Sequence, residues 1–277
     1  MAADPLEAFR SLVEHSDDQI DLAGAALEIA RDEYADLDVG VYLSRIDQLA
    51  IAVNRRLEPS SSVYRKIAAL NYILFQQQGF HGNRDNYYDP KNSFLNEVLE
   101  RKMGIPITLS ILYMELALRI GLPLRGVSFP GHFLVKHASD AEEIVIDPFN
   151  AGDILSDESL NKLLDQLYGG KVSLQRDLLE PVTKKQILSR MLNNLKMIYL
   201  RNNDLFKALP VLQRLVILDP RSAADIRDRG IVYSRIECFS YALADFETYL
   251  QLSPDAADAG AVKEEIIKLG KQVRQVH

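Results

Sequence analysis

Apolar residues recur every three or four positions over most of residues 1–80. This spacing places one apolar stripe along residues 18–34 and another along residues 39–56, which predicts two amphipathic helices. A further helix is expected to begin at Ser61 or Ser62, because serine caps helix N-termini well, and to end at Gly79. The chain therefore begins with a helical part.

The pattern breaks over residues 79–93, where Gly, Asn, Asp and Pro are dense enough to predict an ordered loop. One helix is expected from about Ser93. A second is expected to begin at Pro106, since proline favours the first helical turn, and to end before Gly121.

Beyond Pro123 the hydrophobic period changes to two, which indicates strands. The predicted strands cover residues 124–129, 131–137 and 143–147, with a hairpin tip at Ser139-Asp140 and a helix following over residues 155–168. We therefore expect an α+β domain over residues 1–170: a helical N-terminal part with a small antiparallel sheet. Residues 171–180 are expected to connect it to a second domain.

The C-terminal part of the chain is self-similar. Leu218-Asp219-Pro220 recurs as Leu252-Ser253-Pro254, and Ala208-Leu209 recurs as Ala242-Leu243. The offset between the copies is the period of tetratricopeptide repeats, a helix-turn-helix unit of about 34 residues. The second domain is thus predicted over residues 181–277, with repeats at 189–222 and 223–256 and a capping helix behind them.

The repeat positions also have a physical logic. Ala208 and Ala242 let two helices approach closely, whereas Lys196 departs from the small residue that is usual at its position. Stacked repeats form a concave surface that receives peptides or protein surfaces. We therefore expect a protein or peptide partner.

Charge and composition narrow the function classes. A net charge of −7 disfavours nucleic acid, and no run of about 18 apolar residues is present to predict a membrane span. The N-terminus lacks the features of a secretory signal, so we expect a cytoplasmic protein. The single cysteine, Cys238, falls at the turn between the helices of the second repeat. His81 has no second ligand at metal spacing, and we expect neither a metal nor a cofactor.

The most informative stretch runs from Arg101 to Asp147. A hairpin with its tip at Ser139-Asp140 would put His132 directly opposite Asp147 on one face of the sheet. A histidine oriented by a carboxylate is the base of a nucleophilic triad, whose third member is favoured at a helix N-terminus. The helix that begins at Pro106 lies at the matching place in the chain.

This arrangement resembles the transglutaminase-like core of the papain-like thiol enzymes. The resemblance rests on Arg101-Lys102-Met103-Gly104-Ile105-Pro106, Gly131-His132-Phe133 and Ile146-Asp147-Pro148. It implies that His132 and Asp147 match the family's His and Asp, and that Pro106 stands at the cysteine position. Proline has no nucleophilic atom, and neither Thr108 nor Ser110 replaces the cysteine neatly around the helix.

The chain also resembles the bacterial SirB-type proteins, which join a transglutaminase-like domain to tetratricopeptide repeats. The shared signatures are Asp89-Pro90-Lys91-Asn92-Ser93, Gly104-Ile105-Pro106-Ile107, Pro130-Gly131-His132-Phe133 and Asp147-Pro148-Phe149. Members of this branch generally have proline at the cysteine position and no settled activity.

We therefore predict a catalytically degenerate adaptor that binds proteins through its repeats and a vestigial cleft. His132 and Asp147 are the vestigial pair, and the cleft candidates are Asn83, Tyr87, Tyr88 and Asn92. The alternative is an amide hydrolase or acyl transferase that uses His132 and Asp147 with a non-cysteine nucleophile or activated water. A purely structural scaffold, with the cleft filled by side chains, is a third possibility.

Overall fold

A computed structural model describes residues 4–139 and 142–276 and divides the chain between two compact units. One unit spans residues 12–191. The other combines residues 192–277 with residues 1–11. The boundary at Met191 and Leu192 falls inside one long helix, α8 (Lys184–Arg201).

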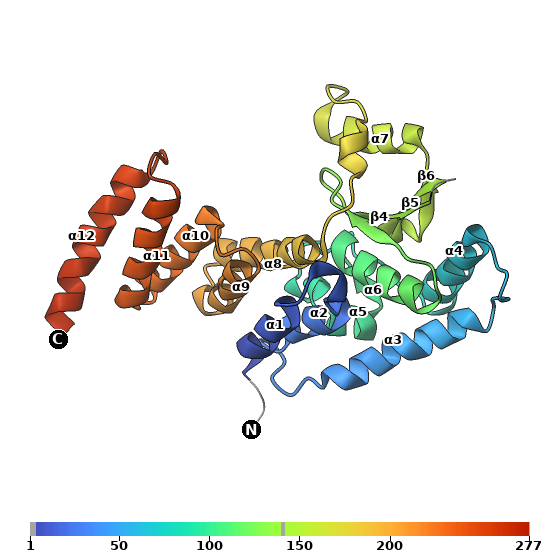
Figure 1. Cartoon of the computed structure of the whole chain (residues 1–277), viewed down its shortest axis with the longest axis horizontal. Helices are drawn as coiled ribbons and strands as arrows, with labels where there is room; N and C mark the ends of the chain where they lie inside the picture. Colours follow the sequence, from blue (N-terminus) through green and yellow to red (C-terminus); the bar gives the residue numbers. More distant parts are fainter. Residues whose placement is uncertain (1–3, 140–141, 277) are drawn as a thin grey trace. The chain divides into compact units, whose positions relative to one another are not determined.

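The unit of residues 12–191 contains helices before and after a small sheet in the chain order (Figure 1). Its α-helices are α2 (Leu22–Ala30), α3 (Val39–Asn54), α4 (Val63–Asn71), α5 (Leu95–Arg101), α6 (Pro106–Arg119) and α7 (Asp157–Tyr168). The helix α1 (Pro5–Val13) precedes them, and short helical turns occur at η1 (Asp17–Gln19), η3 (Pro90–Ser93), η4 (Pro148–Asn150) and η5 (Arg176–Leu179).

Side-chain caps explain where several of these helices begin. Asp21, Asp38 and Ser62 each accept a hydrogen bond from a backbone N–H in the first turn of α2, α3 and α4. The predicted helix that begins at Ser62 changes character near its end, since Tyr72–Gln77 forms a π-helical turn, η2. Gly79 has a φ of 76°, which only glycine adopts without strain, and follows this turn.

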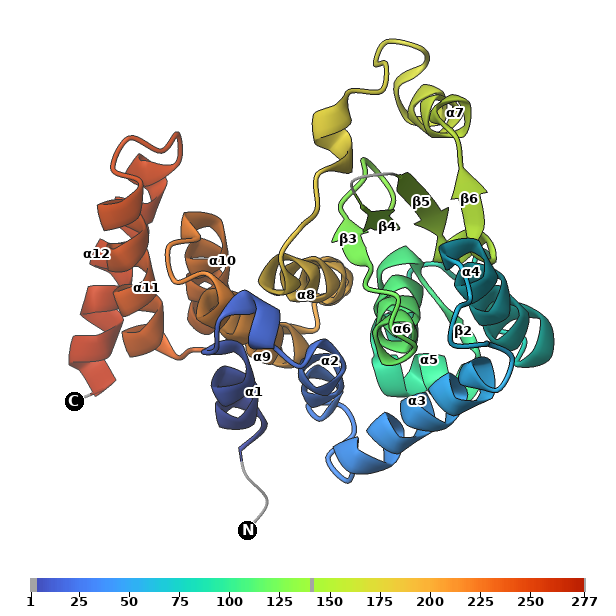
Figure 2. The same ribbon diagram turned by 45° about the vertical axis from the view of Figure 1, so that its right-hand side comes forward.

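The main sheet has four antiparallel strands in the order β3-β4-β5-β6 (Figure 2). They are β3 (Arg125–Val127), β4 (Leu134–Ala138), β5 (Glu143–Asp147) and β6 (Asp153–Leu155). The sheet and α7 enclose a core that includes Val127, Phe129, Leu134, Leu160 and Leu164. The predicted strand 143–147 matches β5, whereas β3 is shorter than the predicted 124–129, β4 begins three residues after the predicted start at 131, and β6 was not predicted.

A second, parallel pair joins β1 (His81–Gly82) to β2 (Met103–Gly104). This pair ties the loop before α5 to the start of α6. The helix α6 is buried along nearly its whole length and packs against α3, β4 and η4. It is the central helix of this unit.

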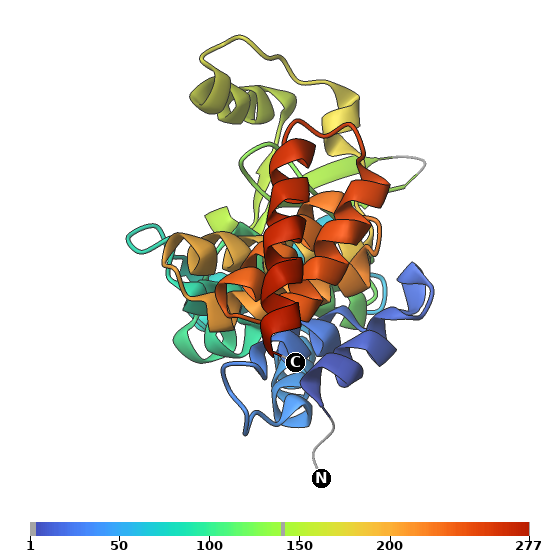
Figure 3. The same ribbon diagram turned by 90° about the vertical axis from the view of Figure 1, so that its left-hand side faces the viewer.

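The second unit is an array of antiparallel helices. It comprises the end of α8, then α9 (Leu205–Leu218), α10 (Ala223–Arg235), α11 (Phe239–Leu252) and α12 (Ala259–Val276). Helices α11 and α12 run side by side (Figure 3). Ala242, Phe246 and Tyr249 pack with Val262 and Leu269 in its core. Helices occupy the predicted repeats, and α12 lies where the capping helix was predicted. None of the described helices is both long and apolar enough to cross a membrane.

Candidate functional site

His132 and Asp147 form a close pair in the unit of residues 12–191. The His132 Nε2 atom lies 2.8 Å from Asp147 Oδ2, within hydrogen-bond distance. The Asp147 side chain is fully buried and that of His132 is 14% exposed. The predicted contact between these two residues is therefore present, with the imidazole directed at the carboxylate.

The strand register that brings His132 and Asp147 together differs from the predicted one. Val135 faces Ile146 in the sheet, and this register places Asp147 opposite Leu134 rather than His132. The predicted direct opposition is wrong, because the hairpin connection is longer than two residues; Asp140 of the predicted tip lies outside the described residues. His132 precedes β4 and reaches Asp147 diagonally, a distance that a long side chain spans.

The backbone before His132 is set by glycine. Gly131 has a φ of 64°, and a Cβ added there would lie 2.7 Å from a methyl carbon of Leu167. The left-handed conformation favours glycine at this position, whereas the exposed Leu167 side chain could move to admit a Cβ. The turn of Pro130 and Gly131 thus aims the following imidazole.

Asp147 has a second set of partners besides His132. Its Oδ1 atom accepts hydrogen bonds from the backbone N–H of Phe149 at 3.0 Å and of Asn150 at 3.3 Å, and so caps η4. Its Oδ2 atom accepts from Asn150 Nδ2 at 2.7 Å. With His132 this makes four hydrogen bonds, which is the full capacity of a carboxylate. The carboxylate therefore organises the end of β5 as well as the imidazole.

An aromatic group covers one side of the pair. The Phe149 ring meets His132 edge to face at 5.8 Å and Tyr87 at 6.4 Å between ring centroids. The Arg84 guanidinium lies over the Phe149 ring at 5.1 Å and also bonds the Asn150 side chain. This arrangement links the loop after β1 to the residues that hold Asp147.

Two asparagines hold that loop together. Asn83 Nδ2 donates to Asn92 Oδ1 at 3.0 Å, and Asn92 Nδ2 donates to the backbone carbonyls of Asn86 and Tyr87 at 2.7 and 3.2 Å. Both asparagines are buried, so their amides satisfy the loop's own backbone. Tyr87 and Tyr88 are 37% and 63% exposed, and their rings contact each other edge to face. Their role as walls of a cleft stays a prediction.

Sequence reasoning missed Arg190. Its guanidinium donates to the His132 backbone carbonyl and to Ser128 Oγ, both at 3.2 Å. Burial lowers the pKa of Arg190, and burial raises the pKa of Tyr87 while the nearby Arg190 charge opposes that rise. Arg190 was not predicted because it lies 58 residues after His132, in a segment that we had assigned to the first repeat. The sequence shows only that Arg190 is a basic residue on α8, which does not indicate its contact with His132.

Pro106 is the first residue of α6 and is buried. Thr108, two residues on, donates from Oγ1 to the Asn92 carbonyl at 2.7 Å, and the same oxygen accepts from the Ile105 N–H at 3.2 Å. The Thr108 hydroxyl is therefore occupied in capping the helix. Ser110 is fully buried, and Cys238 lies in the other unit at the start of α11. No metal-suited group of three or more His, Cys, Asp or Glu side chains occurs in residues 4–139 and 142–276.

The comparisons with known proteins agree with this layout. A sequence model of the transglutaminase-like superfamily matches residues 41–193, and one of the tetratricopeptide repeat matches residues 195–266. A UPF0162 protein of Xylella fastidiosa is 39% identical over 275 residues, which covers 98% of each chain. A UPF0162 protein of Vibrio cholerae is 32% identical over 70% of this chain and 72% of its own.

Another relative shares only part of the chain. The F-box only protein 21 of Mus musculus is 37% identical over 140 residues, which cover 46% of this chain and 21% of that protein. Two matches show which family this chain belongs to. The bacterial relatives match it over most of its length, and the superfamily model covers more than half of it. The chain belongs to the transglutaminase-like superfamily and carries tetratricopeptide repeats after its transglutaminase-like domain.

Proposed function

We propose that this chain is a cytoplasmic adaptor that binds other proteins and whose transglutaminase-like domain is catalytically degenerate. The observation that carries the proposal is Pro106 at the first position of α6, where the family resemblance puts the nucleophile. A pyrrolidine ring has no group that attacks a carbonyl and no N–H to stabilise an oxyanion. The net charge of −7 favours a protein partner over nucleic acid.

The surroundings of Pro106 support this reading. The Thr108 hydroxyl already bonds a backbone carbonyl and a backbone N–H. The four hydrogen bonds on Asp147 give the histidine–aspartate pair a structural task that persists without catalysis. We infer that the pair is retained to shape the surface that Tyr87 and His132 present.

The repeats offer a surface for the partner. Met197 on α8 and Ile231 on α10 are separated by one repeat period, so they occupy the same position of successive repeats. Both are exposed, at 64% and 42%. Equivalent positions of stacked repeats share one face, and exposed apolar side chains on a common face mark an interaction surface. We infer that the partner contacts this face.

The test measures how much partner protein the full chain captures, in the wild type and in variants of the proposed surface. Met197→Glu combined with Ile231→Glu is expected to reduce capture of the partner at least tenfold, because two charges would be buried on binding. The matched control is Ile51→Glu, at a residue 52% exposed on α3, which should leave capture unchanged. Equal capture by the double variant and the wild type would contradict the proposed surface.

A second candidate function is an amide hydrolase or acyl transferase that uses water or a non-cysteine nucleophile. The observation that favours it is the intact 2.8 Å contact between His132 and Asp147. Turnover of a panel of amide substrates that is lost in His132→Ala would support this function. Equal rates for wild type and His132→Ala, at the level of the uncatalysed reaction, would eliminate it.

A further inference from the structure

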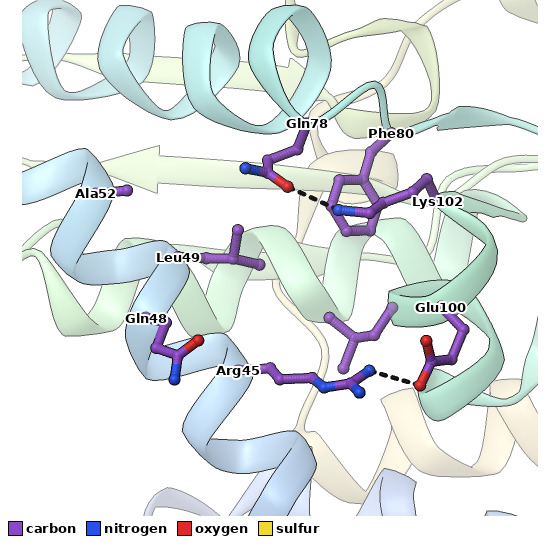
Figure 4. Close-up of a pocket in the computed structure, with 9 residues that line it drawn as sticks. Arg45, Gln48, Leu49, Ala52, Gln78, Phe80, Glu100 and Lys102 are labelled. Carbon is purple, nitrogen blue, oxygen red and sulfur yellow. Dashed lines mark hydrogen bonds and ion pairs between the residues drawn. The ribbon is translucent and has the colours of Figure 1, made fainter.

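A pocket of about 400 Å³ opens between α3 and the C-terminal end of α5 (Figure 4). It does not include His132, Asp147 or Pro106. Its lining combines two cations, one carboxylate, two amides and four apolar residues: Arg45, Lys102, Glu100, Gln48, Gln78, Leu49, Ala52, Phe80 and Leu99. A cavity of this size is large enough for a small molecule, and its lining mixes five polar or charged side chains with four apolar ones.

The charges in the pocket are not balanced. Arg45 pairs with Glu100 at 2.5 Å, and the same carboxylate oxygen accepts from the Tyr42 hydroxyl at 3.1 Å. Lys102 instead donates from Nζ to the neutral Gln78 Oε1 at 2.7 Å and lies over the Phe80 ring at 4.8 Å. The lining contains two cations, Arg45 and Lys102, and one carboxylate, Glu100. Because Arg45 pairs with Glu100, the excess positive charge lies at Lys102. An ammonium has three N–H donors, so Lys102 retains donors for a ligand.

The backbone at Lys102 is unusual for a lysine. It ends α5 in the left-handed conformation, with φ 61° and ψ 24°, where glycine or asparagine is normally preferred. Its backbone N–H and carbonyl bond Val98 and His81, and a glycine would make both bonds without strain. Ala151, Asn203 and Glu237 also have positive φ, so this conformation supports a binding role for Lys102 only together with the charges and lining of the pocket. Gln78, its partner, closes the π-helical turn η2, a rare feature that is frequent at functional sites.

We propose that this pocket binds a small organic carboxylate that carries a short apolar group. The carboxylate would accept hydrogen bonds from Lys102 Nζ and from a side-chain amide, and the apolar group would lie against Leu49, Leu99 and Phe80. Such a ligand matches the excess charge and covers the apolar wall at once. In Figure 4 the side chains of Lys102 and Arg45 reach from opposite sides of the pocket toward the space between the two helices.

The electrostatics at Lys102 agree with this ligand. Burial lowers the pKa of Lys102, and the nearby Arg45 charge lowers it further, whereas Glu100 raises it. A bound carboxylate would supply the missing counter-charge and favour the ammonium form. A neutral analogue of the same shape gains nothing from this attraction. The two ligand classes are therefore separable by experiment.

The experiment is an NMR titration of the ¹⁵N-labelled full chain with benzoate and, separately, with its neutral analogue benzamide. We expect saturable shifts at the pocket residues with benzoate, and binding of benzamide at least tenfold weaker. Lys102→Met should weaken benzoate binding at least tenfold. The control Lys162→Met removes an exposed lysine of α7 that pairs with Glu158, and should leave binding unchanged.

A second variant guards against a folding defect. Lys102→Gly removes the side chain and relieves the left-handed strain, so we expect a melting temperature close to or above that of the wild type together with loss of benzoate binding. Equal affinities for benzoate and benzamide would overturn the proposal. So would undiminished benzoate binding by the two Lys102 variants, or the absence of saturable shifts at the pocket residues.

Discussion

At the scale of single residues, Asp147 shows how one side chain serves both the fold and the site. It accepts hydrogen bonds from His132, from two backbone N–H groups of η4 and from the Asn150 amide. The carboxylate is fully buried, so each of these donors depends on it. His132, in contrast, is partly exposed and lies at the edge of this network.

This asymmetry leads to a prediction about stability. Asp147→Ala should lower the free energy of unfolding by about 3 kcal/mol, because it leaves several buried donors without an acceptor. His132→Ala should cost only about 1 kcal/mol, since the other three hydrogen bonds of Asp147 remain. Urea unfolding of the full chain measures both. Equal losses for the two variants would contradict a mainly structural role for Asp147.

The site was predictable from sequence only in part, and the reasons are local. His132, Asp147 and Pro106 stand in short motifs with fixed residue types, so they could be recognised before any geometry was known. Arg190 could not, because its contact with the His132 carbonyl depends on how a distant helix packs. The hairpin register shifted because strand alternation specifies which face a residue occupies but leaves the length of the connection open.

At the scale of elements, several helix ends were predictable, although the helix predicted over residues 18–34 is shorter at both ends and forms α2 over Leu22–Ala30. Side-chain caps and glycine stops are encoded within a few residues, as at Ser62, Asp38 and Gly121. Short strands were harder: β1, β2 and β6 span only two or three residues and carry no periodic pattern. These strands exist because neighbouring elements pair with them. The repeat helices were predicted best, since two copies report the same structure.

Lys196 stands where the repeat pattern usually has a small residue, and its contacts between helices explain this difference. Its ammonium pairs with Asp225 at 2.7 Å and with Asp228 at 3.3 Å, so it joins α8 to α10. A small residue at this position would bring the helices close but would leave both carboxylates without this cation. The lysine therefore replaces close packing by an ion pair between successive repeats.

The central helix α6 carries a titratable group that gives a second prediction. Burial raises the pKa of the Glu115 carboxyl, and Arg119, which pairs with it at 2.5 Å, opposes this rise; Asp21 adds to it and Lys184 opposes it. The folded chain thus holds the Glu115 proton more tightly than the unfolded chain. This contribution is fully present below the unfolded pKa of about 4.3 and is lost as the pH rises through the folded value.

Glu115→Gln should therefore gain stability relative to the wild type as the pH rises from about 4 to 7. Urea midpoints of the two proteins across this range give the measurement. Glu158→Gln is the control, because the exposed Glu158 on α7 pairs with Lys162 and its pKa is lowered rather than raised. A difference between Glu115→Gln and wild type that shrinks with rising pH would reverse the assigned sign.

At the scale of the whole molecule, each unit contains a hydrophobic cluster of its own. One lies under the main sheet and includes Leu134 and Leu164, and the other lies among the repeat helices and includes Phe246 and Tyr249. The family matches divide at nearly the same place as the units, between residues 193 and 195. Each unit can thus be weakened by its own substitution.

Separate cores lead to a prediction about local stability. Phe246 is 3% exposed in the repeats, and Phe133 is 1% exposed beside β4, so truncation of either to alanine should cost about 3–5 kcal/mol in its own unit. Phe246→Ala should lower the amide protection of α10, α11 and α12 and spare β4 and β5. Phe133→Ala should have the opposite pattern, because the cavity it creates lies in the other unit.

Hydrogen exchange followed by mass spectrometry on the full chain measures both patterns in one experiment, since peptides from each unit report separately. The two variants serve as controls for each other, because the residue type and the change are the same. If either substitution lowered protection in both units to the same extent, the two cores would have to unfold as one cooperative body. The crossed pattern would instead mean that the repeats can lose order while the fold around His132 and Asp147 persists, and that variants of one unit can be interpreted without correcting for the other.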